Sequence, residues 1–326
     1  MEKDEIFQNL VDLHVHLGST SAPHFLWEIA HKQGIKLPTK DYWQFIKSIT
    51  VNERQSYNEY LDYFHLTELI QSSLYAVERA VHHAASLLYR KGNITLLELR
   101  FNPMLRNNEN EHDLDKIILA AVIGMKKASL DYPIKGGLIL MMDRRFTAKM
   151  NRIIVEKAIF FKNDGVVGVD LGGPLREDFK IDDVVPAFEM ARKAGLKLTV
   201  HTGEVTGIKE MWEVMEKIAP DRIGHGVRAI HDPKLLDHLA KEKIVLEICP
   251  SSNLKTSVFR SWNDFRIVFD ALNDKNVRYT INSDGPVFLK TTVLEEFKKL
   301  LKHHVITRED VVKLTKVARE STFLNL

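Results

Sequence analysis

The chain has 326 residues, and its 46 lysines and arginines against 44 aspartates and glutamates leave a formal net charge of +2. Hydrophobic residues make up 44% of the sequence and charged residues 28%, which is typical of a globular protein with a sizeable core and excludes a disordered or collagen-like chain. The balanced charge offers no basic surface for phosphates, so we expect no nucleic-acid partner.

The sequence carries no recognisable targeting or membrane segment. Its single cysteine, Cys249, excludes an intrachain disulfide and a cysteine-rich zinc site and suits a reducing compartment. The acidic N-terminus leads into no long apolar run, and no stretch approaches the roughly 18 apolar residues that a membrane span needs. We therefore expect a cytoplasmic protein without membrane contact. A single domain over residues 1–326 is expected, because α/β barrels reach this length as one domain.

Taken in chain order, the sequence alternates short apolar runs with longer amphipathic stretches. The apolar runs span residues 10–15, 94–99, 134–142, 166–171, 196–200, 222–224, 244–248 and 277–281. Most are continuous in valine, isoleucine and leucine rather than alternating with polar residues, which is the pattern of parallel strands buried on both faces. The run at 222–224 is the shortest. We predict eight strands in a parallel sheet.

Helical patterns fill the intervals, at residues 76–89, 113–129, 150–163, 184–194, 208–218, 233–241 and 262–272. Several of these helices should end at Gly92, Gly165, Gly195 and Pro220. Strands that alternate with helices predict a (β/α)8 TIM barrel, with a doubly wound open sheet as the alternative. Residues 21–89 are too many for one helix, and they predict extra helices that cap the C-terminal mouth of the barrel.

Histidines and an aspartate stand where predicted strands end. His14 and His16 are two residues apart, so both imidazoles point the same way from one strand. Such a pair alone can also be two packed histidines. His201 and Asp284 end two further strands, and three nitrogens with one carboxylate suit zinc, with iron, cobalt or nickel as alternatives. The fourth strand carries no lysine that could bridge two metals, so we predict one Zn²⁺ per chain.

Two further strand-end residues could take part in proton transfer. Glu204 lies three residues after His201 and could act as general acid or base. Its alternative role is that of a glutamate favoured at a helix start. His225, between two glycines, could hold the attacking water or stabilise negative charge, and it could also be a further metal ligand or a core histidine.

The remaining strand ends carry weaker signals. The Gly172–Gly173 pair after the fourth strand allows a ligand close to the backbone, although a simple turn explains it equally well. Cys249 lacks an unassigned base with which to form a nucleophile. Glu98 and Arg100 are interpreted as a structural charge pair.

Five spaced motifs together resemble those of the adenosine deaminase family. They are Asp12-Leu-His-Val-His-Leu, His201-Thr-Gly-Glu, Arg222-Ile-Gly-His-Gly, Cys249-Pro-Ser-Ser-Asn and Asn282-Ser-Asp-Gly-Pro, and they span the chain from about residue 10 to about residue 290. The resemblance implies zinc ligands, which are His14, His16, His201 and Asp284. It also implies that Glu204 protonates the purine N1, that His225 orients the attacking hydroxide and that the backbone of Gly173 contacts the purine N3.

Two positions depart from the family pattern. Gly18 stands where the family has an aspartate that binds the ribose 5′-hydroxyl, and Gly285 stands where a second aspartate binds the purine N7. Both are substrate-binding positions, so the resemblance keeps the reaction and leaves the identity of the substrate open. We expect zinc-dependent hydrolytic deamination of a 6-aminopurine nucleoside, either adenosine or a 5′-modified relative for which Gly18 leaves room.

Three alternatives to this function remain at this point. They are a deaminase of a non-purine aminoheterocycle, a metal-dependent amidase or esterase on the same barrel, and a binding protein that has lost catalysis. The expected partner is a small nucleoside-like substrate, and the sequence leaves the oligomeric state undetermined.

Overall fold

The computed structural model describes residues 4–107 and 113–326, and its centre is an eight-stranded parallel barrel. The strands are β1 (Leu10–His16), β2 (Ile94–Phe101), β3 (Lys135–Asp143), β4 (Val166–Gly172), β5 (Lys197–Thr202), β6 (Arg222–His225), β7 (Val245–Ile248) and β8 (Arg278–Ile281). Neighbours pair in chain order, and a bridge between Val15 and Asp284 joins the last strand to the first. The predicted barrel is confirmed, including its shortest strand, and the open sheet is excluded.

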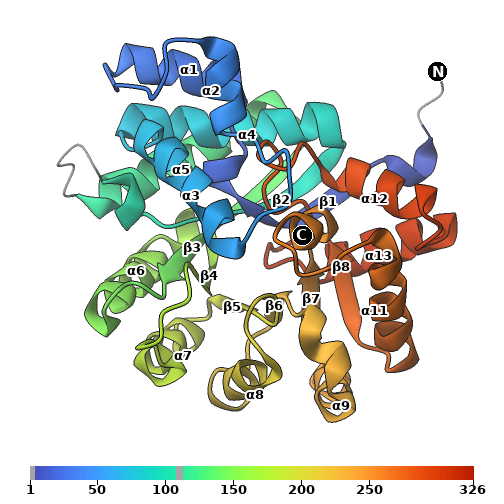
Figure 1. Ribbon diagram of the computed structural model, residues 1–326. Coiled ribbons are helices and arrows are strands. Elements are labelled where there is room, and N and C mark those ends of the chain that lie inside the picture. Colours follow the sequence, from blue (N-terminus) through green and yellow to red (C-terminus); the bar gives the residue numbers. More distant parts are fainter. Residues whose placement is uncertain (1–3, 108–112) are drawn as a thin grey trace.

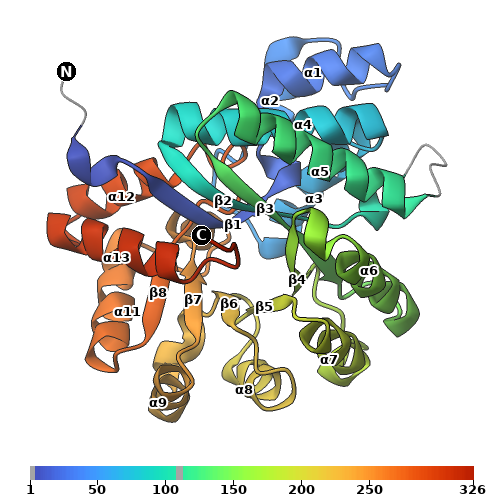
Figure 2. The same ribbon diagram turned by 180° about the vertical axis from the view of Figure 1, so that it is seen from behind.

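Helices surround the barrel on its outer side (Figures 1 and 2). The seven predicted ones are α4 (Leu74–Gly92), α5 (Leu114–Asp131), α6 (Ala148–Phe160), α7 (Val185–Lys193), α8 (Ile208–Lys217), α9 (Pro233–Lys241) and α11 (Trp262–Asp274). The sequence analysis missed α10 (Pro250–Lys255), α12 (Val293–Lys302) and α13 (Arg308–Glu320). None of the helices within the described residues is long and apolar enough to cross a membrane.

Helix ends follow local side-chain chemistry with one correction. The hydroxyls of Ser73 and Thr147 accept backbone N–H bonds at the starts of α4 and α6. Gly195 has a φ of +83° after α7, as a helix-ending glycine should. Gly92, in contrast, is the last residue of α4, and Asn93 takes the left-handed position with a φ of 54°. Asparagine tolerates that conformation because its short amide bonds locally.

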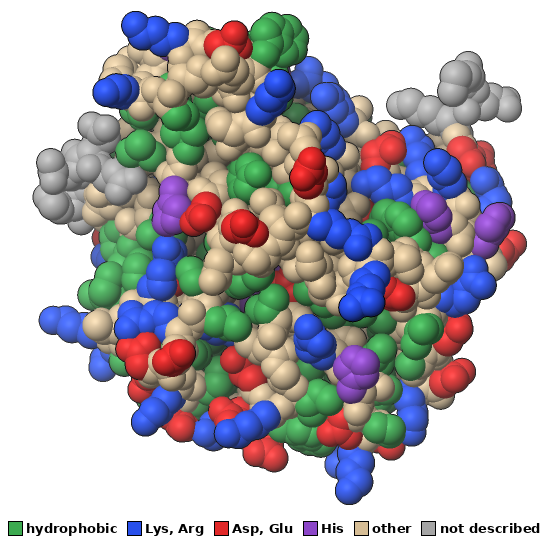
Figure 3. Space-filling model, viewed as in Figure 1, with side chains coloured by type: hydrophobic (Ala, Val, Ile, Leu, Met, Phe, Trp, Pro, Cys, Tyr) green, Lys and Arg blue, Asp and Glu red, His purple; other side chains and the backbone are tan. Residues whose placement is uncertain are grey.

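The long segment before β2 forms α1 (Pro23–Lys32), α2 (Tyr42–Ser48) and α3 (Tyr57–Ile70) as well as α4. Figure 1 looks onto the mouth of the barrel, where α3 lies across the strands while α1 and α2 lie at the periphery. The predicted extra helices are therefore present, with the capping helix α3 over the mouth and α1 and α2 beside it at the periphery. On this face, basic and acidic side chains are interspersed (Figure 3).

A layer of paired charges fills the barrel interior beneath the mouth. Arg100 is fully buried and donates from Nη1 to Asp170 Oδ2 and from Nη2 to Glu247 Oε2, both at 2.8 Å. Arg222 pairs with Glu98 and, at 2.7 Å, with the other oxygen of Glu247. The predicted pairing of Glu98 with Arg100 is therefore wrong, because each finds its partner on another strand. Paired in this way, the charges need no solvent.

Candidate active site

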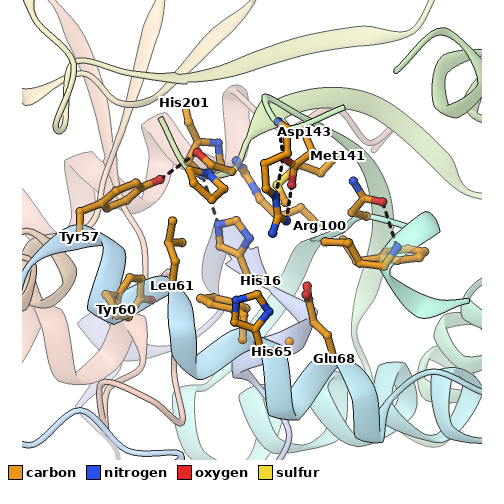
Figure 4. Close-up of a pocket in the computed structure, with 18 of the residues that line it drawn as sticks. His16, Tyr57, Tyr60, Leu61, His65, Glu68, Arg100, Met141, Asp143 and His201 are labelled. Atoms are coloured by element: carbon orange, nitrogen blue, oxygen red, sulfur yellow. Dashed lines mark hydrogen bonds and ion pairs between the residues drawn. The ribbon is translucent and has the colours of Figure 1, made fainter. Parts of the chain in front are cut away.

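A cavity of about 270 Å³ opens at the C-terminal mouth between the strand ends and α3. Seven of the predicted site residues line it, and they are His16, Gly18, Gly173, His201, Glu204, His225 and Asp284. His14 lies buried beneath it, and Gly285 follows Asp284. Figure 4 shows Tyr57, Tyr60, Leu61, His65 and Glu68, all on α3, around His16 and His201. The fold therefore brings the predicted residues together in one place.

Three imidazoles converge at the floor of this cavity. Ligand nitrogens of His14, His16 and His201 all lie within 4.8 Å of one another, with His16 Nε2 only 3.2 Å from His201 Nε2. Among the described residues, the buried Nε2 of His14 has no hydrogen-bond partner. Burial holds the pKa values of His14 and His16 well below the ordinary value, so these rings are neutral. Neutral imidazole nitrogens are common zinc ligands, so this cluster fits a zinc ion.

Asp284 supplies the oxygen of the predicted ligand set. Its Oδ1 lies 3.5 Å from His16 Nε2. Its backbone N–H donates to the His14 carbonyl at 2.8 Å, and its own carbonyl accepts from the His16 N–H at 2.9 Å. These bonds hold the residue at a φ of 59°, a conformation that a non-glycine residue rarely adopts. The strand that carries two ligands therefore also positions the fourth.

Two buried carboxylates orient the imidazoles from behind. Glu247 Oε2 lies 2.7 Å from His14 Nδ1, and Asp170 Oδ2 lies 3.0 Å from His201 Nδ1. Because each Nδ1–H donates to a carboxylate, each Nε2 presents its lone pair to the site. Arg100 joins the two carboxylates. The sequence analysis assigned no role to Glu247 or Asp170, although a charged residue within a predicted buried strand was an available signal.

Glu204 and His225 form the other wall of the site. Glu204 Oε1 accepts bonds from Asn253 Nδ2 at 3.2 Å and Thr256 Oγ1 at 3.3 Å, and its Oε2 lies 3.5 Å from His225 Nε2. Burial raises the pKa of Glu204 to about 7, so its carboxyl can hold a proton near neutral pH. Burial lowers the pKa of His225 to about 4, so that ring is neutral.

Asn253 fixes both of these groups at once. Its amide nitrogen also lies 3.2 Å from His225 Nδ1, and because the amide donates there, the neutral ring carries its proton on Nε2. That N–H therefore faces the cavity side of the ring, near Glu204. Asn253 comes from the motif at residues 249–253, which was noted in the sequence without a role for this residue.

Gly173 is a glycine for a geometric reason. Its φ is +89°, and a Cβ atom there would lie 2.6 Å from the carboxylate of Asp143. Asp143 is itself held by Arg145 at 2.7 Å, and both residues line the cavity. A bulkier residue would collide, and the site would lose this close approach to the backbone.

The place beside Gly18 is filled rather than open. A Cβ atom there would lie 2.8 Å from Phe64 Cδ1 and 3.4 Å from Arg106 Nη2. The expectation that the glycine leaves room for a substrate substituent is therefore wrong in this structure, because an aromatic ring occupies that room. A basic group now stands near the position where the resemblance implies an acidic one.

The place beside Gly285 is also filled, by a hydroxyl group. A Cβ atom there would lie 2.7 Å from Tyr60 Oη and 3.3 Å from Ser19 Oγ. Any side chain at this position would therefore have to displace Tyr60. The sequence analysis did not identify Tyr60, Phe64 or Arg106. No local pattern in residues 57–106 indicates that these side chains lie beside the two glycines.

Cys249 lies near the imidazoles without being reactive. Its sulfur lies within 4.8 Å of ligand atoms of His14 and His225. Burial raises the pKa of its thiol well above the ordinary value, so it stays protonated. Cys249 is therefore excluded as a nucleophile because its thiol stays protonated, and not because it lacks a nearby base.

Comparison with known proteins gives matches along nearly the whole chain. The sequence model of the family described as "Adenosine deaminase" matches residues 9–326. An adenosine deaminase of Shewanella denitrificans is 29% identical over 319 residues, which are 97% of this chain and 94% of that protein.

Solved structures share the fold at lower identity. The crystal structure of an adenine deaminase from Arthrobacter aurescens superposes with a TM-score of 0.87 at 18% identity, over 98% of this chain and 94% of that one. An N6-mAMP deaminase from Arabidopsis gives 0.85 at 24% identity, over 98% and 95%.

Proposed function

Because this chain belongs to the adenosine deaminase family, we propose that it hydrolyses the amino group of a 6-aminopurine, releasing ammonia. The observation that carries the proposal is the shared cavity floor, where three converging imidazoles and Asp284 face a buried, protonatable Glu204. An amidase would need no acid placed to protonate a ring nitrogen. Ammonia release and ultraviolet absorbance over a panel of purines, aminopyrimidines and simple amides test the proposal, and turnover of the amides alone would contradict it.

One zinc ion per chain is proposed at His14, His16, His201 and Asp284. The fit rests on the convergent Nε2 atoms and on the carboxylates of Glu247 and Asp170, which turn those atoms inward. Bound there, zinc would lower the pKa of water toward neutrality and so supply hydroxide.

Glu204 would act as the general acid. Its carboxyl, protonated below about pH 7, donates a proton to the purine N1, which makes the adjacent C6 electrophilic. An attacking hydroxide would add to C6, and the C6–N bond would then break as the proton of the added hydroxyl passes to the amino group, which leaves as ammonia. His225, held neutral by its surroundings, donates from Nε2 to the attacking oxygen and fixes its direction.

Arg106 indicates what the 5′ end of the substrate carries. The side chain lines the cavity but is only 1% exposed, and among the described residues neither Nε nor Nη1 has a hydrogen-bond partner. Its carboxylate partner within the described part of the chain, Glu68, is 3.8 Å away, and burial raises the pKa of that group. A buried guanidinium whose Nε and Nη1 have no hydrogen-bond partner is unfavourable, and an anionic ligand would compensate it. We therefore propose a 5′-anionic adenine nucleotide as substrate, the class for which the Arabidopsis relative is named.

Substitution of Arg106 should abolish the preference for an anionic 5′ group. A hydrogen bond to a charged group contributes roughly 1.5–3 kcal/mol, or about 10- to 150-fold. We expect AMP to exceed adenosine by about this factor in kcat/KM, and Arg106→Met to abolish the difference while leaving adenosine turnover in place. Steady-state assays on AMP, adenosine and uncharged 5′-methylthioadenosine measure it.

Two control variants distinguish the loss of the positive charge at residue 106 from a general effect on folding. Arg106→Lys keeps the charge and should retain most of the preference for AMP, whereas Arg152→Met changes an exposed arginine and should alter nothing. A wild-type enzyme that prefers 5′-methylthioadenosine to AMP would show that the subsite selects size and not charge.

A further inference from the structure

The hydroxyl of Tyr60 occupies the place that Gly285 leaves empty of a side chain. Tyr60 Oη lies 2.7 Å from where a Cβ atom on residue 285 would stand, next to the ligand Asp284. In the family pattern, a carboxylate projects from that position and binds the purine N7. In this chain residue 285 has no side chain to bind a ligand, and the phenol hydroxyl of Tyr60 on α3 lies at the same place.

This hydroxyl is buried and unsatisfied. Tyr60 lines the cavity, only 3% of the residue is exposed, and among the described residues its Oη has no hydrogen-bond partner. Buried polar atoms almost always have partners, so an exception at a cavity wall points to a ligand atom. Burial also raises the pKa of the phenol well above its ordinary value, so the group is always a donor at neutral pH.

The ring of Tyr60 is held firmly enough to act as a fixed donor. It packs edge-to-face against Phe64, with ring centres 5.8 Å apart, and against Phe288 at 6.4 Å. Both contacts leave the hydroxyl directed at residue 285, where a glycine alone avoids a collision. Tyr60 and Gly285 are therefore a coupled pair, since the hydroxyl can occupy this place only while residue 285 is a glycine.

Building on the proposed function, we infer that Tyr60 donates the hydrogen bond to N7 of the purine and thereby replaces the missing carboxylate as the determinant of base recognition. A carboxylate must first hold a proton to donate to N7, which is a hydrogen-bond acceptor, whereas a phenol donates without that requirement. Tyr60 is thus a specificity-determining residue supplied by the capping helix rather than by β8.

The decisive experiment compares AMP with 7-deaza-AMP, which has a C–H group in place of N7. Wild type should prefer AMP by roughly 10-fold in kcat/KM, because the analogue leaves the buried hydroxyl unpaired. In Tyr60→Phe, AMP turnover should fall and the two substrates should become equal within about 2-fold. Tyr63→Phe, on the same helix but outside the cavity lining, is the matched control and should keep the preference.

A second measurement tests the coupled pair through stability. Gly285→Ala should lower the thermal unfolding temperature in the wild-type background and lower it less in Tyr60→Phe, since removal of the hydroxyl relieves the collision. Equal losses in both backgrounds would contradict the packing on which the inference rests.

The outcomes separate the two proposals. If wild type turns over both purines equally, or if Tyr60→Phe keeps the full preference, the inference about Tyr60 is wrong while deamination stands. If wild type deaminates neither, the proposed nucleotide substrate is wrong, and calorimetric binding of AMP and 7-deaza-AMP then tests the inference about Tyr60. Equal or absent binding of AMP and 7-deaza-AMP would overturn it.

Discussion

His201→Ala should yield a protein without bound metal and without deaminase activity. His201 Nε2 is one of three converging nitrogens, and Asp170 behind it serves no other ligand. Removal of one imidazole from a four-ligand set lowers metal affinity by several orders of magnitude, because the remaining ligands no longer complete the coordination. Elemental analysis of the purified variant against wild type, which should hold one metal per chain, measures the result.

His65→Ala is the matched control for this change. His65 lines the same cavity, but its side chain is 68% exposed and it lies outside the imidazole cluster. The His65→Ala variant should keep its metal. Two metals per wild-type chain, or full metal content in His201→Ala, would contradict the proposed ligand set.

Glu204→Gln should keep the metal and lose at least about 100-fold in kcat, the usual contribution of a general acid. The amide has the same shape and can still accept the bond from Thr256, but it has no proton to give to N1. The loss should fall on kcat more than on KM, because ground-state contacts remain. Stopped-time ammonia assays with saturating AMP measure it, and a variant that keeps a tenth of wild-type kcat would exclude the acid role.

The pH dependence of the wild-type enzyme checks the same group. A glutamate with its ordinary pKa near 4.5 would be ionised at pH 6, whereas burial raises the pKa of Glu204 to about 7. Since the acid form is the active one, kcat/KM should fall as the pH rises through about 7. Asn253→Ala removes a donor to the carboxylate and should move this fall to higher pH, because the ionised form loses a hydrogen bond.

The sequence by itself determined the barrel and the chemistry at its mouth. Strands buried on both faces are continuous apolar runs, and the sequence predicted even the short β6, as residues 222–224 of its four residues Arg222–His225. In a parallel barrel all carboxyl ends face one side, and this rule alone gathers His14, His201, Glu204 and Asp284 into one site. Such positions are local to a strand, and local patterns are readable in sequence.

The tertiary structure alone decided which residues support and surround that site. His14 and the carboxylate that orients it are 233 residues apart, and Arg100 finds Asp170 and Glu247 on strands that no local pattern joins to its own. Electrostatic pairing inside the barrel depends on which inward side chains meet across it, so Glu98 could not be assigned its partner Arg222 from sequence.

The same reason explains the two glycines. The resemblance shows from sequence that two carboxylates are missing, but the groups that fill their places come from other elements, Phe64 and Tyr60 from α3 with Arg106 after β2 beside Phe64. Close packing fills the place of a lost side chain with whatever neighbour can reach it, and reach is a property of the folded chain. The residues proposed to carry out the reaction therefore lie at the strand ends, where sequence patterns predict them. The residues proposed to select the substrate are brought together only by contacts between distant segments.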